Sequence, residues 1–202
     1  MGRRKPAVLH GFLALDKPAG MTSRHALNRV CRLVGERRAG HAGTLDPDAT
    51  GVLVIAFGEA TKMVRWLTAA PKSYEATVRF GTATSTDDAA GEVVARAPLP
   101  TPWSLDRLAD IAAAQHGWIR QVPPAVSALK RDGVRDHERV RRGEEVQRQP
   151  RDVWLEGATI SRLNGATASC HIRCGSGFYV RAWARDLGVE VGTVAHLATL
   201  RR

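Results

Sequence analysis

The dipeptide Asn164-Gly165 constrains the fold most strongly, because it separates two stretches that read as β-strands, 152–160 and 166–174. Asn-Gly readily adopts the two positive φ angles of a tight hairpin turn. The sequence therefore predicts an antiparallel hairpin near the C-terminal end of the chain. Apolar runs or alternating patterns predict further strands at Gly11–Leu15, Val52–Phe57, Tyr74–Phe80 and Ala195–Leu200.

Helical spacing occurs between these strands. Thr22 or Ser23 is expected to cap a helix, and Ser104 a second one. The first helix carries apolar residues at Ala26, Leu27, Val30, Leu33 and Val34, and the second at Leu105, Leu108, Ile111 and Ala112. Further helices are predicted over 59–69 and from Gly177 to about Val191. A glycine-rich loop is predicted over 40–51 and a polar loop over 82–91. Strands and helices mix without βαβ regularity, which favours an α+β fold.

The formal net charge is +10, and only five of the 30 basic residues are lysines. Arginine forks suit phosphate oxygens, which favours a polyanionic partner. A GC-rich genome would raise Arg and Ala in the same way, so composition leaves both explanations open. Cys31, Cys170 and Cys174 fit neither a CxxC pair nor a disulfide set and are expected to be core residues. With no membrane-length apolar run and no signal-peptide pattern, we expect a soluble cytoplasmic protein.

The segment from His41 to Gly51 is the richest in chemistry-bearing residues. Asp46 precedes a proline, where an aspartate often forms an Asx turn or caps a helix. Asp46-Pro47-Asp48-Ala49-Thr50 also fits the D-x-D-x-T pattern of magnesium-dependent phosphatases, which requires an apolar strand leading straight into the first aspartate. The preceding residues, 38–44, do not have that character. The local sequence alone leaves a structural and a catalytic role for Asp46 open.

Distant segments, taken together, carry a more specific signal. They are Leu13-Ala14-Leu15-Asp16-Lys17-Pro18-Ala19-Gly20-Met21-Thr22-Ser23, the Asp46 segment 38–51, Lys72-Ser73-Tyr74, Gln121-Val122-Pro123-Pro124 with Ser127-Ala128-Leu129-Lys130 and Gly133, Cys174-Gly175-Ser176-Gly177-Phe178-Tyr179-Val180-Arg181 with Asp186-Leu187-Gly188, and 197–202. In this order they resemble the TruB-type tRNA pseudouridine synthases over nearly the whole chain. The combination is specific, although each piece alone is not.

The resemblance implies the pseudouridine-synthase α+β fold, with a mixed, mainly antiparallel sheet, flanking helices and a central active-site cleft. It implies one catalytic domain over residues 1–202, in which 122–151 is a protruding RNA-clamping element that is mobile without RNA. Most relatives continue into a small C-terminal RNA-binding domain. That accessory domain is expected to be absent here, because the chain stops at Arg202.

The resemblance also implies a role for individual residues. Asp46 falls on the nucleophilic aspartate, Tyr74 on the tyrosine that stacks on the target uracil, and Arg181 on the arginine that pairs with the catalytic carboxylate. The remaining substrate-binding positions are His41, Tyr179 and Leu200 around the flipped nucleotide, Lys17 in the lysine-proline motif that supports the active-site loop, and Lys130 in the clamping element.

The implied reaction is the conversion of a uridine in the tRNA T-arm, at position 55, to pseudouridine, by a monomer that needs neither cofactor nor metal. Two alternatives remain: an RNA-binding protein or tRNA-folding chaperone with weak or lost catalysis, and a guide-RNA-dependent enzyme. The sequence departs from the family pattern at two places. Asp48 replaces an apolar residue and is expected to point to solvent, and His137 replaces a tyrosine in the clamping element.

Overall fold

The computed structural model describes residues 8–125, 130–131, 134–135 and 148–202. The chain divides into two compact units, one formed by residues 1–71 with 200–202 and the other by residues 72–199. Each unit has its own sheet and helices, and each is described by itself.

The first unit is built on a three-stranded antiparallel sheet in the order β1-β3-β2. The strands are β1 (Gly11–Lys17), β3 (Gly51–Phe57) and β2 (Ala39–Ala42). The predicted strands are confirmed, but Val52 is 44% exposed, so β3 is not buried along its whole length. The predicted loop over 40–51 is wrong at its start. Residues 39–42 form β2 because the edge of β3 pairs with them, His41 standing opposite Ile55.

Helix α1 (Ser23–Val34) packs on this sheet. Its Leu27 and Val30 form a buried cluster with Ile55 and Phe57 of β3. Thr22 caps the helix, its side chain accepting from the His25 amide, as predicted. Leu33 and Val34 are exposed, contrary to the predicted apolar stripe. The core cluster ends near Cys31, so the last turn of the helix extends beyond it.

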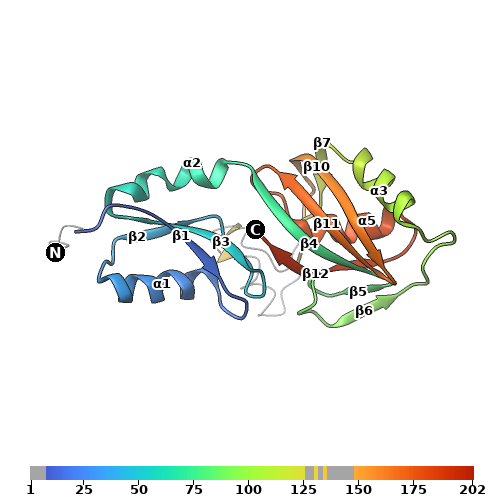
Figure 1. Cartoon of the computed structure of the whole chain (residues 1–202), viewed down its shortest axis with the longest axis horizontal. Helices are drawn as coiled ribbons and strands as arrows, with labels where there is room; N and C mark the ends of the chain where they lie inside the picture. The colour runs from blue at the N-terminus through green and yellow to red at the C-terminus, as the bar shows by residue number, and fades with distance from the viewer. Residues whose placement is uncertain (1–7, 126–129, 132–133, 136–147) are drawn as a thin grey trace. The chain divides into compact units, whose positions relative to one another are not determined.

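The predicted helix over 59–69 is two consecutive pieces, the 3-10 helix η1 (Gly58–Met63) and α2 (Val64–Ala69). Figure 1 shows α1 and α2 on opposite sides of the three-stranded sheet.

The second unit contains a five-stranded sheet in the order β12-β4-β11-β10-β7. The strands are β12 (Ala195–Arg201), β4 (Lys72–Phe80), β11 (Thr167–Cys174), β10 (Arg151–Asn164) and β7 (Gly117–Gln121). The predicted hairpin is β10 and β11, which pair antiparallel up to Asn164 and Thr167. Strand β4 alternates as predicted, burying Ala76, Val78 and Phe80 and exposing Glu75 and Arg79.

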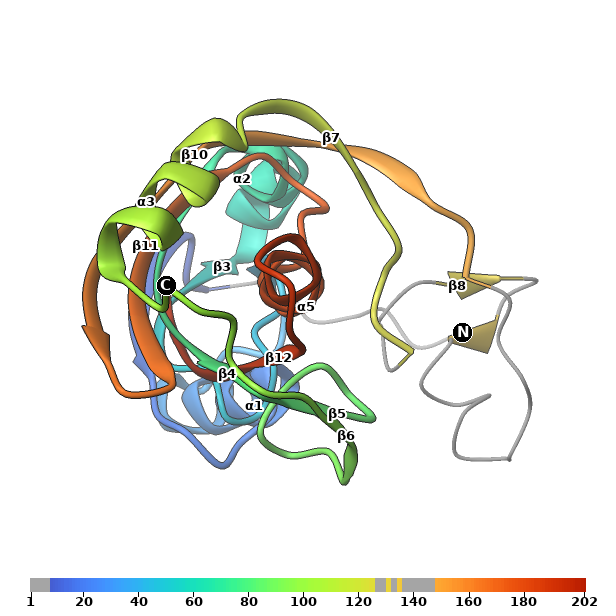
Figure 2. The same cartoon turned by 90° about the vertical axis from the view of Figure 1, so that its right-hand side faces the viewer.

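Among the described residues of this unit, two helices complete the fold: α3 (Leu105–Ala114), capped by Ser104 as predicted, and α5 (Val180–Glu190). Helix α5 contributes the fully buried Trp183 and Leu187 to the core, and Figure 2 shows it end-on with the strands curving around it. The helix begins three residues after Gly177, which has a φ of 81° and lies in the preceding turn. The predicted helix start was therefore too early.

The predicted polar loop over 82–91 is also wrong at its start, where β5 (Thr82–Thr84) pairs with β6 (Val93–Arg96). Within the predicted clamping element 122–151, the described residues include the short strands β8 (Lys130–Arg131) and β9 (Val134–Arg135). The predicted protrusion and mobility of this element concern mainly residues 126–129, 132–133 and 136–147. These residues, which include His137, and the side chain of Lys130 lie outside what the structure describes.

The three cysteines form no disulfide. Cys170 and Cys174 are buried on β11, and burial raises the pKa of each thiol to about 12. Cys31 is half-buried beside the core cluster of the first unit. The prediction that they are core residues is therefore confirmed. In the described parts of the chain, no helix has the length and apolar character needed to cross a membrane.

Candidate functional site

Asp46 lies on the loop that joins β2 to β3 in the first unit. Gly43, with a φ of 76°, turns the chain out of β2, and the Ala49 amide donates to the Asp46 carbonyl at 3.2 Å. Leu45 and Ala49 are buried, whereas Asp46 is half-buried and Asp48 is exposed. The apolar residues thus attach the loop to the unit, and the expectation that Asp48 points to solvent is confirmed.

Lys17 supports this loop from the end of β1. Its side chain has no exposed surface, and its Nζ donates to the carbonyls of Pro18, Met21 and Pro47, each at 2.8 Å. Burial lowers the pKa of Lys17, while the negative charges of Asp48 and Asp46 act to raise it. Three carbonyl oxygens satisfy all three donors of an ammonium group, so Lys17 joins the turn after β1 to the residue that follows Asp46.

His41 lies on β2, a few residues before Asp46. Burial is the largest cause of its lowered pKa, followed by the positive charges of Arg24 and Arg202. Its Nδ1 is buried and has no hydrogen-bond partner within the described chain. The ring is therefore neutral near pH 7, a state in which one nitrogen can donate and the other accept.

The last three residues pack against the same loop. The Thr50 amide donates to the Leu200 carbonyl at 2.9 Å, and the Val52 amide to the Arg202 carbonyl at 3.0 Å. The Arg202 guanidinium also donates to the Gly43 carbonyl at 3.1 Å. Gly51 has a φ of 100°, and a Cβ there would collide with the Arg202 carbonyl. Leu200 is therefore held next to the residues that follow Asp46.

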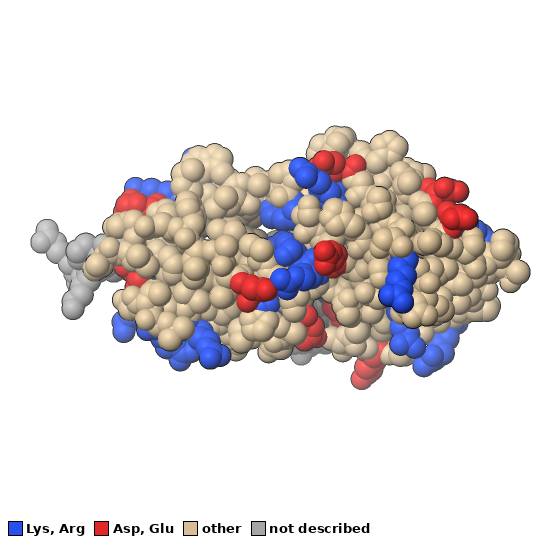
Figure 3. All heavy atoms as spheres, viewed as in Figure 1, with Lys and Arg blue, Asp and Glu red and all other residues tan. Residues whose placement is uncertain are grey.

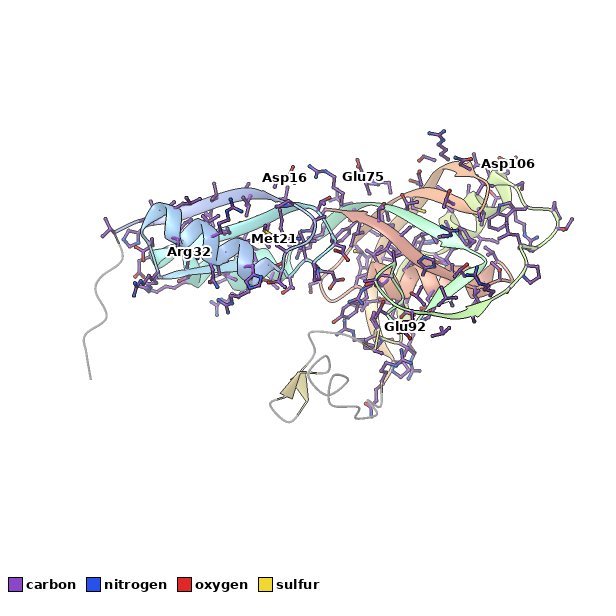
Figure 4. The ribbon with its side chains drawn as sticks, turned by 90° about the horizontal axis from the view of Figure 1, so that it is seen from below. Asp16, Met21, Arg32, Glu75, Glu92 and Asp106 are labelled. Atoms are coloured by element: carbon purple, nitrogen blue, oxygen red, sulfur yellow. The ribbon has the colours of Figure 1, made fainter. Side chains whose placement is uncertain are left out.

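The second unit carries the other predicted site residues. Tyr74 is half-buried on β4, opposite Ile172 of β11 and on the same strand face as the buried Ala76 and Val78. Its neighbour Glu75, labelled in Figure 4, lies on the other, exposed face. Tyr74 thus lies on the apolar face of β4, near the start of the strand. An aromatic ring in such a position suits a side chain that stacks on a base.

Arg181 is the second residue of α5 and is 5% exposed. Its guanidinium donates to the Thr86 carbonyl at 3.0 Å and lies 3.3 Å from a carboxylate oxygen of Asp88. The other oxygen of Asp88 accepts from the Thr86 hydroxyl at 2.5 Å and from the Ala90 amide at 3.1 Å. A structured loop after β5 thus holds both the carboxylate and the arginine.

Arg185 repeats this arrangement one turn further along α5. It lies 2.8 Å from a carboxylate oxygen of Asp87 and donates to the Val122 carbonyl at 2.9 Å. Burial raises the pKa of Asp87, and the charge of Arg185 opposes the shift. Sequence reasoning gave Asp87, Asp88 and Arg185 no role. The sequence did carry one signal for these ion pairs: two arginines four residues apart on a predicted helix, which share one helix face, and two adjacent aspartates in a loop.

Tyr179 precedes α5 and is held through its backbone. Its amide donates to the Gln121 Oε1 at 3.1 Å, and the Gln121 Nε2 donates to its carbonyl at 3.2 Å. The Arg151 guanidinium lies 4.9 Å from the centre of the Tyr179 ring and donates to the Gly177 carbonyl. Gln121 and Arg151 were also missed from the sequence, because nothing local to them indicates this contact.

The predicted site residues therefore form two groups. Lys17, His41, Asp46 and Leu200 belong to the first unit, and Tyr74, Tyr179 and Arg181 to the second. On the face drawn in Figure 3, Lys and Arg side chains occur in separate groups with Asp and Glu among them, so charge alone marks no single binding patch there.

The comparisons with known proteins identify the family. The model of the TruB family pseudouridylate synthase N-terminal domain matches residues 31–180. The tRNA pseudouridine synthase B of Roseobacter denitrificans is 47% identical over 202 residues, 99% of this chain and 66% of that protein. The Bordetella pertussis protein of the same name is 43% identical, in a match that covers 100% of this chain and 83% of that protein. This chain belongs to the TruB family.

Solved structures agree on the fold of this TruB-family chain. The structure of a Cbf5-Nop10-Gar1 complex superposes with a TM-score of 0.73 at 26% identity, covering 96% of this chain and 48% of the other. The structure of an H/ACA RNP bound to a substrate RNA containing 2'-deoxyuridine superposes with a TM-score of 0.69 at 23% identity. It covers 96% of this chain and 46% of the other, and at this identity the likeness shows the fold alone. The predicted pseudouridine-synthase α+β fold is thus confirmed. The chain spans about two thirds of the length of the first curated relatives it matches.

The structure also bears on the D-x-D-x-T hypothesis for Asp46 and Asp48. The strand before them, β2, belongs to an antiparallel sheet and is separated from Asp46 by the turn at Gly43. The phosphatase pattern needs a strand that runs directly into the first aspartate. Together with membership of the TruB family, this argues against a magnesium phosphatase.

Proposed function

We propose that this chain isomerises a uridine of tRNA to pseudouridine, and that the target is the T-arm uridine at position 55. The observation that carries the proposal is identity of 43–48% over essentially the whole chain with relatives named tRNA pseudouridine synthase B. These relatives are named for tRNA as the substrate, which favours a tRNA enzyme over a guide-RNA-dependent one.

The chemistry requires that the N1–C1′ bond of uridine break, that the base turn, and that a C5–C1′ bond form. C5 then loses its proton and N1 takes one up, so the product is an isomer of the substrate. We assign the first step to Asp46, whose ionised carboxylate adds to the sugar or the base, or removes a sugar proton. The half-buried position of Asp46 supports this role, because a reacting group must be held in place and hydrogen bonds to Leu45 and Pro47 fix the backbone on both sides of it.

Tyr74 and Arg181 supply the remaining parts. A target base must leave its stack to be reached, and stacking on the Tyr74 ring offsets that cost. Arg181 is buried and permanently charged, so it favours the ionised form of a carboxylate beside it. We assign His41, Tyr179 and Leu200 to contacts around the flipped nucleotide, Lys17 to support of the Asp46 loop, and Lys130 to the RNA stem.

We also propose that the partner is a tRNA T-arm stem-loop and that the enzyme binds it as a monomer in the cytoplasm. Neither the isomerisation nor the assigned residues call for a cofactor or a metal, since no redox change or net hydrolysis takes place.

The test is tritium release from C5-labelled uridine in an unmodified tRNA transcript, in the presence of EDTA. We expect release by the wild-type chain and a loss of at least about 1,000-fold for Asp46→Asn, since the carboxylate is the reacting group. Transcript binding should remain within about threefold for the variant, because one neutralised carboxylate removes no phosphate contact.

Wild-type binding without tritium release would instead support the RNA-binding or folding-chaperone alternative. Equal release by both proteins would remove Asp46 from the chemistry, and release that EDTA abolishes would contradict the metal-free reaction.

A further inference from the structure

The hydroxyl of Ser23 is hydrogen-bonded to the backbone of Leu45, the residue before Asp46. Ser23 is the first residue of α1 and is 2% exposed. Its Oγ donates to the Leu45 carbonyl at 3.0 Å and accepts from the Leu45 amide at 2.9 Å. One side-chain oxygen therefore satisfies both backbone groups of Leu45, much as a neighbouring strand would.

This contact complements the one made by Lys17. Lys17 Nζ and the Gly20 amide donate to the Pro47 carbonyl at 2.8 and 3.0 Å. The residues immediately before and after Asp46 are thus both bonded to the segment that runs from the end of β1 into α1. Because Leu45 is also 3% exposed, its backbone and its side chain are fixed together.

The neighbouring hydroxyl, Thr22, has a different task. Its Oγ1 is the cap of α1 and accepts from the His25 amide at 3.1 Å. Helix capping therefore does not require the Ser23 hydroxyl. Figure 4 labels Met21, which comes just before these two residues, and Arg32 in the last turn of the helix.

We propose that Ser23 is a positioning residue for Asp46, acting through the backbone of Leu45. The proposal rests on the assignment of Asp46 as the reacting group. A catalytic carboxylate must be held close to its productive geometry, and a displacement of about 1 Å can cost about 100-fold in rate. Ser23 and Lys17 together limit that displacement from both sides of the loop.

The experiment compares Ser23→Ala and Ser23→Cys with the control Thr22→Ala. Alanine removes the hydroxyl, and cysteine keeps the volume but bonds weakly. Single-turnover rates are measured with saturating tRNA transcript, and Kd is measured by filter binding. Amide hydrogen exchange of Leu45 and Asp46 is followed by NMR in all proteins, and thermal melting is recorded for each.

We expect both Ser23 variants to react about 10- to 100-fold more slowly, with Kd within about twofold of wild type. Their Leu45 and Asp46 amides should exchange faster. Thr22→Ala should lower the melting temperature, leave these amides unchanged and change the rate by less than about twofold, because it affects the helix end alone.

Rates of both Ser23 variants that fall only as far as that of Thr22→Ala would overturn the proposal. So would unchanged exchange at Leu45, which is measured independently of catalysis. If the wild-type chain forms no pseudouridine, the proposed function fails, and the exchange data alone then decide whether Ser23 fixes the loop. If Ser23→Ala does not fold, Ser23→Cys carries the comparison.

Discussion

The two units of the molecule hold their candidate site residues in different ways. In the first unit, a buried lysine and a buried serine bind backbone groups on either side of Asp46. In the second, acidic side chains hold the arginines of α5: Asp88 contacts Arg181, and Asp87 contacts Arg185. The first unit thus fixes the Asp46 loop through its peptide groups, whereas the second fixes the two arginine side chains of α5 through ion pairs.

The difference follows from what each residue is expected to do. A reacting carboxylate must stay available to a ligand, so the protein fixes the peptide groups around Asp46. Arg181 contributes a permanent charge, and a charge removed from water needs an opposite charge or strong acceptors nearby. The two arrangements therefore predict different responses to mutation.

The largest effect is expected for Lys17→Met, which should test the backbone support in the first unit. Loss of the fully buried Nζ leaves three partly buried carbonyls without this donor, so we expect the free energy of unfolding to fall by about 3 kcal/mol. Denaturant titration measures it. The control is Lys62→Met, whose side chain is 71% exposed and pairs with Glu59, and about 1 kcal/mol or less is expected there. Similar losses for the two lysines would contradict the role given to Lys17.

A smaller effect is expected for Asp88→Asn in the second unit. The amide keeps one acceptor oxygen but places a donor near Arg181, so we expect a loss of about 1–3 kcal/mol in stability. Because the arginine remains and shifts, the rate of pseudouridine formation should fall more than the affinity for tRNA. Asp106→Asn, an exposed first-turn residue of α3, is the matched control and should cost about 1 kcal/mol or less. An unaltered rate for Asp88→Asn would show that the ion pair serves stability alone.

The smallest effect is a pH dependence that arises from His41. Because the folded-state pKa of His41 lies below its ordinary value of 6.5, the unfolded chain binds the proton more readily. This contribution to stability is therefore present above pH 6.5 and is lost as the pH falls toward the lowered pKa. The slope is at most about 1.4 kcal/mol per pH unit.

Unfolding titrations of wild type and His41→Gln between pH 5 and 8 check this dependence. The variant should lose that part of the slope. Asp16 and Glu59, whose lowered pKa values arise from ion pairs, act below pH 4.5 and do not overlap with it. The same slope in both proteins would mean that another group titrates in this range.

Local sequence patterns predicted most of the regular structure. The Asn164-Gly165 hairpin, the caps at Thr22 and Ser104, and the alternation of β4 were all found where expected. Each depends on residues within one turn or one strand, so the signal is local. The resemblance to the TruB family supplied the list of site residues, because an ordered set of motifs over the whole chain is far more specific than any one of them.

Other features depend on partners far apart in the sequence. Residues 39–42 contain two alanines and a glycine, and they form β2 because β3 lies beside them. Arg181 reaches Thr86 across 95 positions, and Arg185 reaches Asp87 across 98. Leu33 and Val34 fit the apolar spacing of α1 but are exposed, since the core cluster ends before them.

The sequence by itself thus determined where most of the strands, the Asn164-Gly165 turn and the two capped helix starts lie, and its resemblance to the TruB family supplied the candidate site residues. Only the tertiary structure decided which other groups hold them: Ser23 for the Asp46 loop, and Asp88 and Gln121 for the residues that begin α5. The physical reason is that a hydrogen bond or ion pair forms only where two groups lie close together in the folded chain. Local sequence patterns do not determine the distance between groups that are far apart in the sequence.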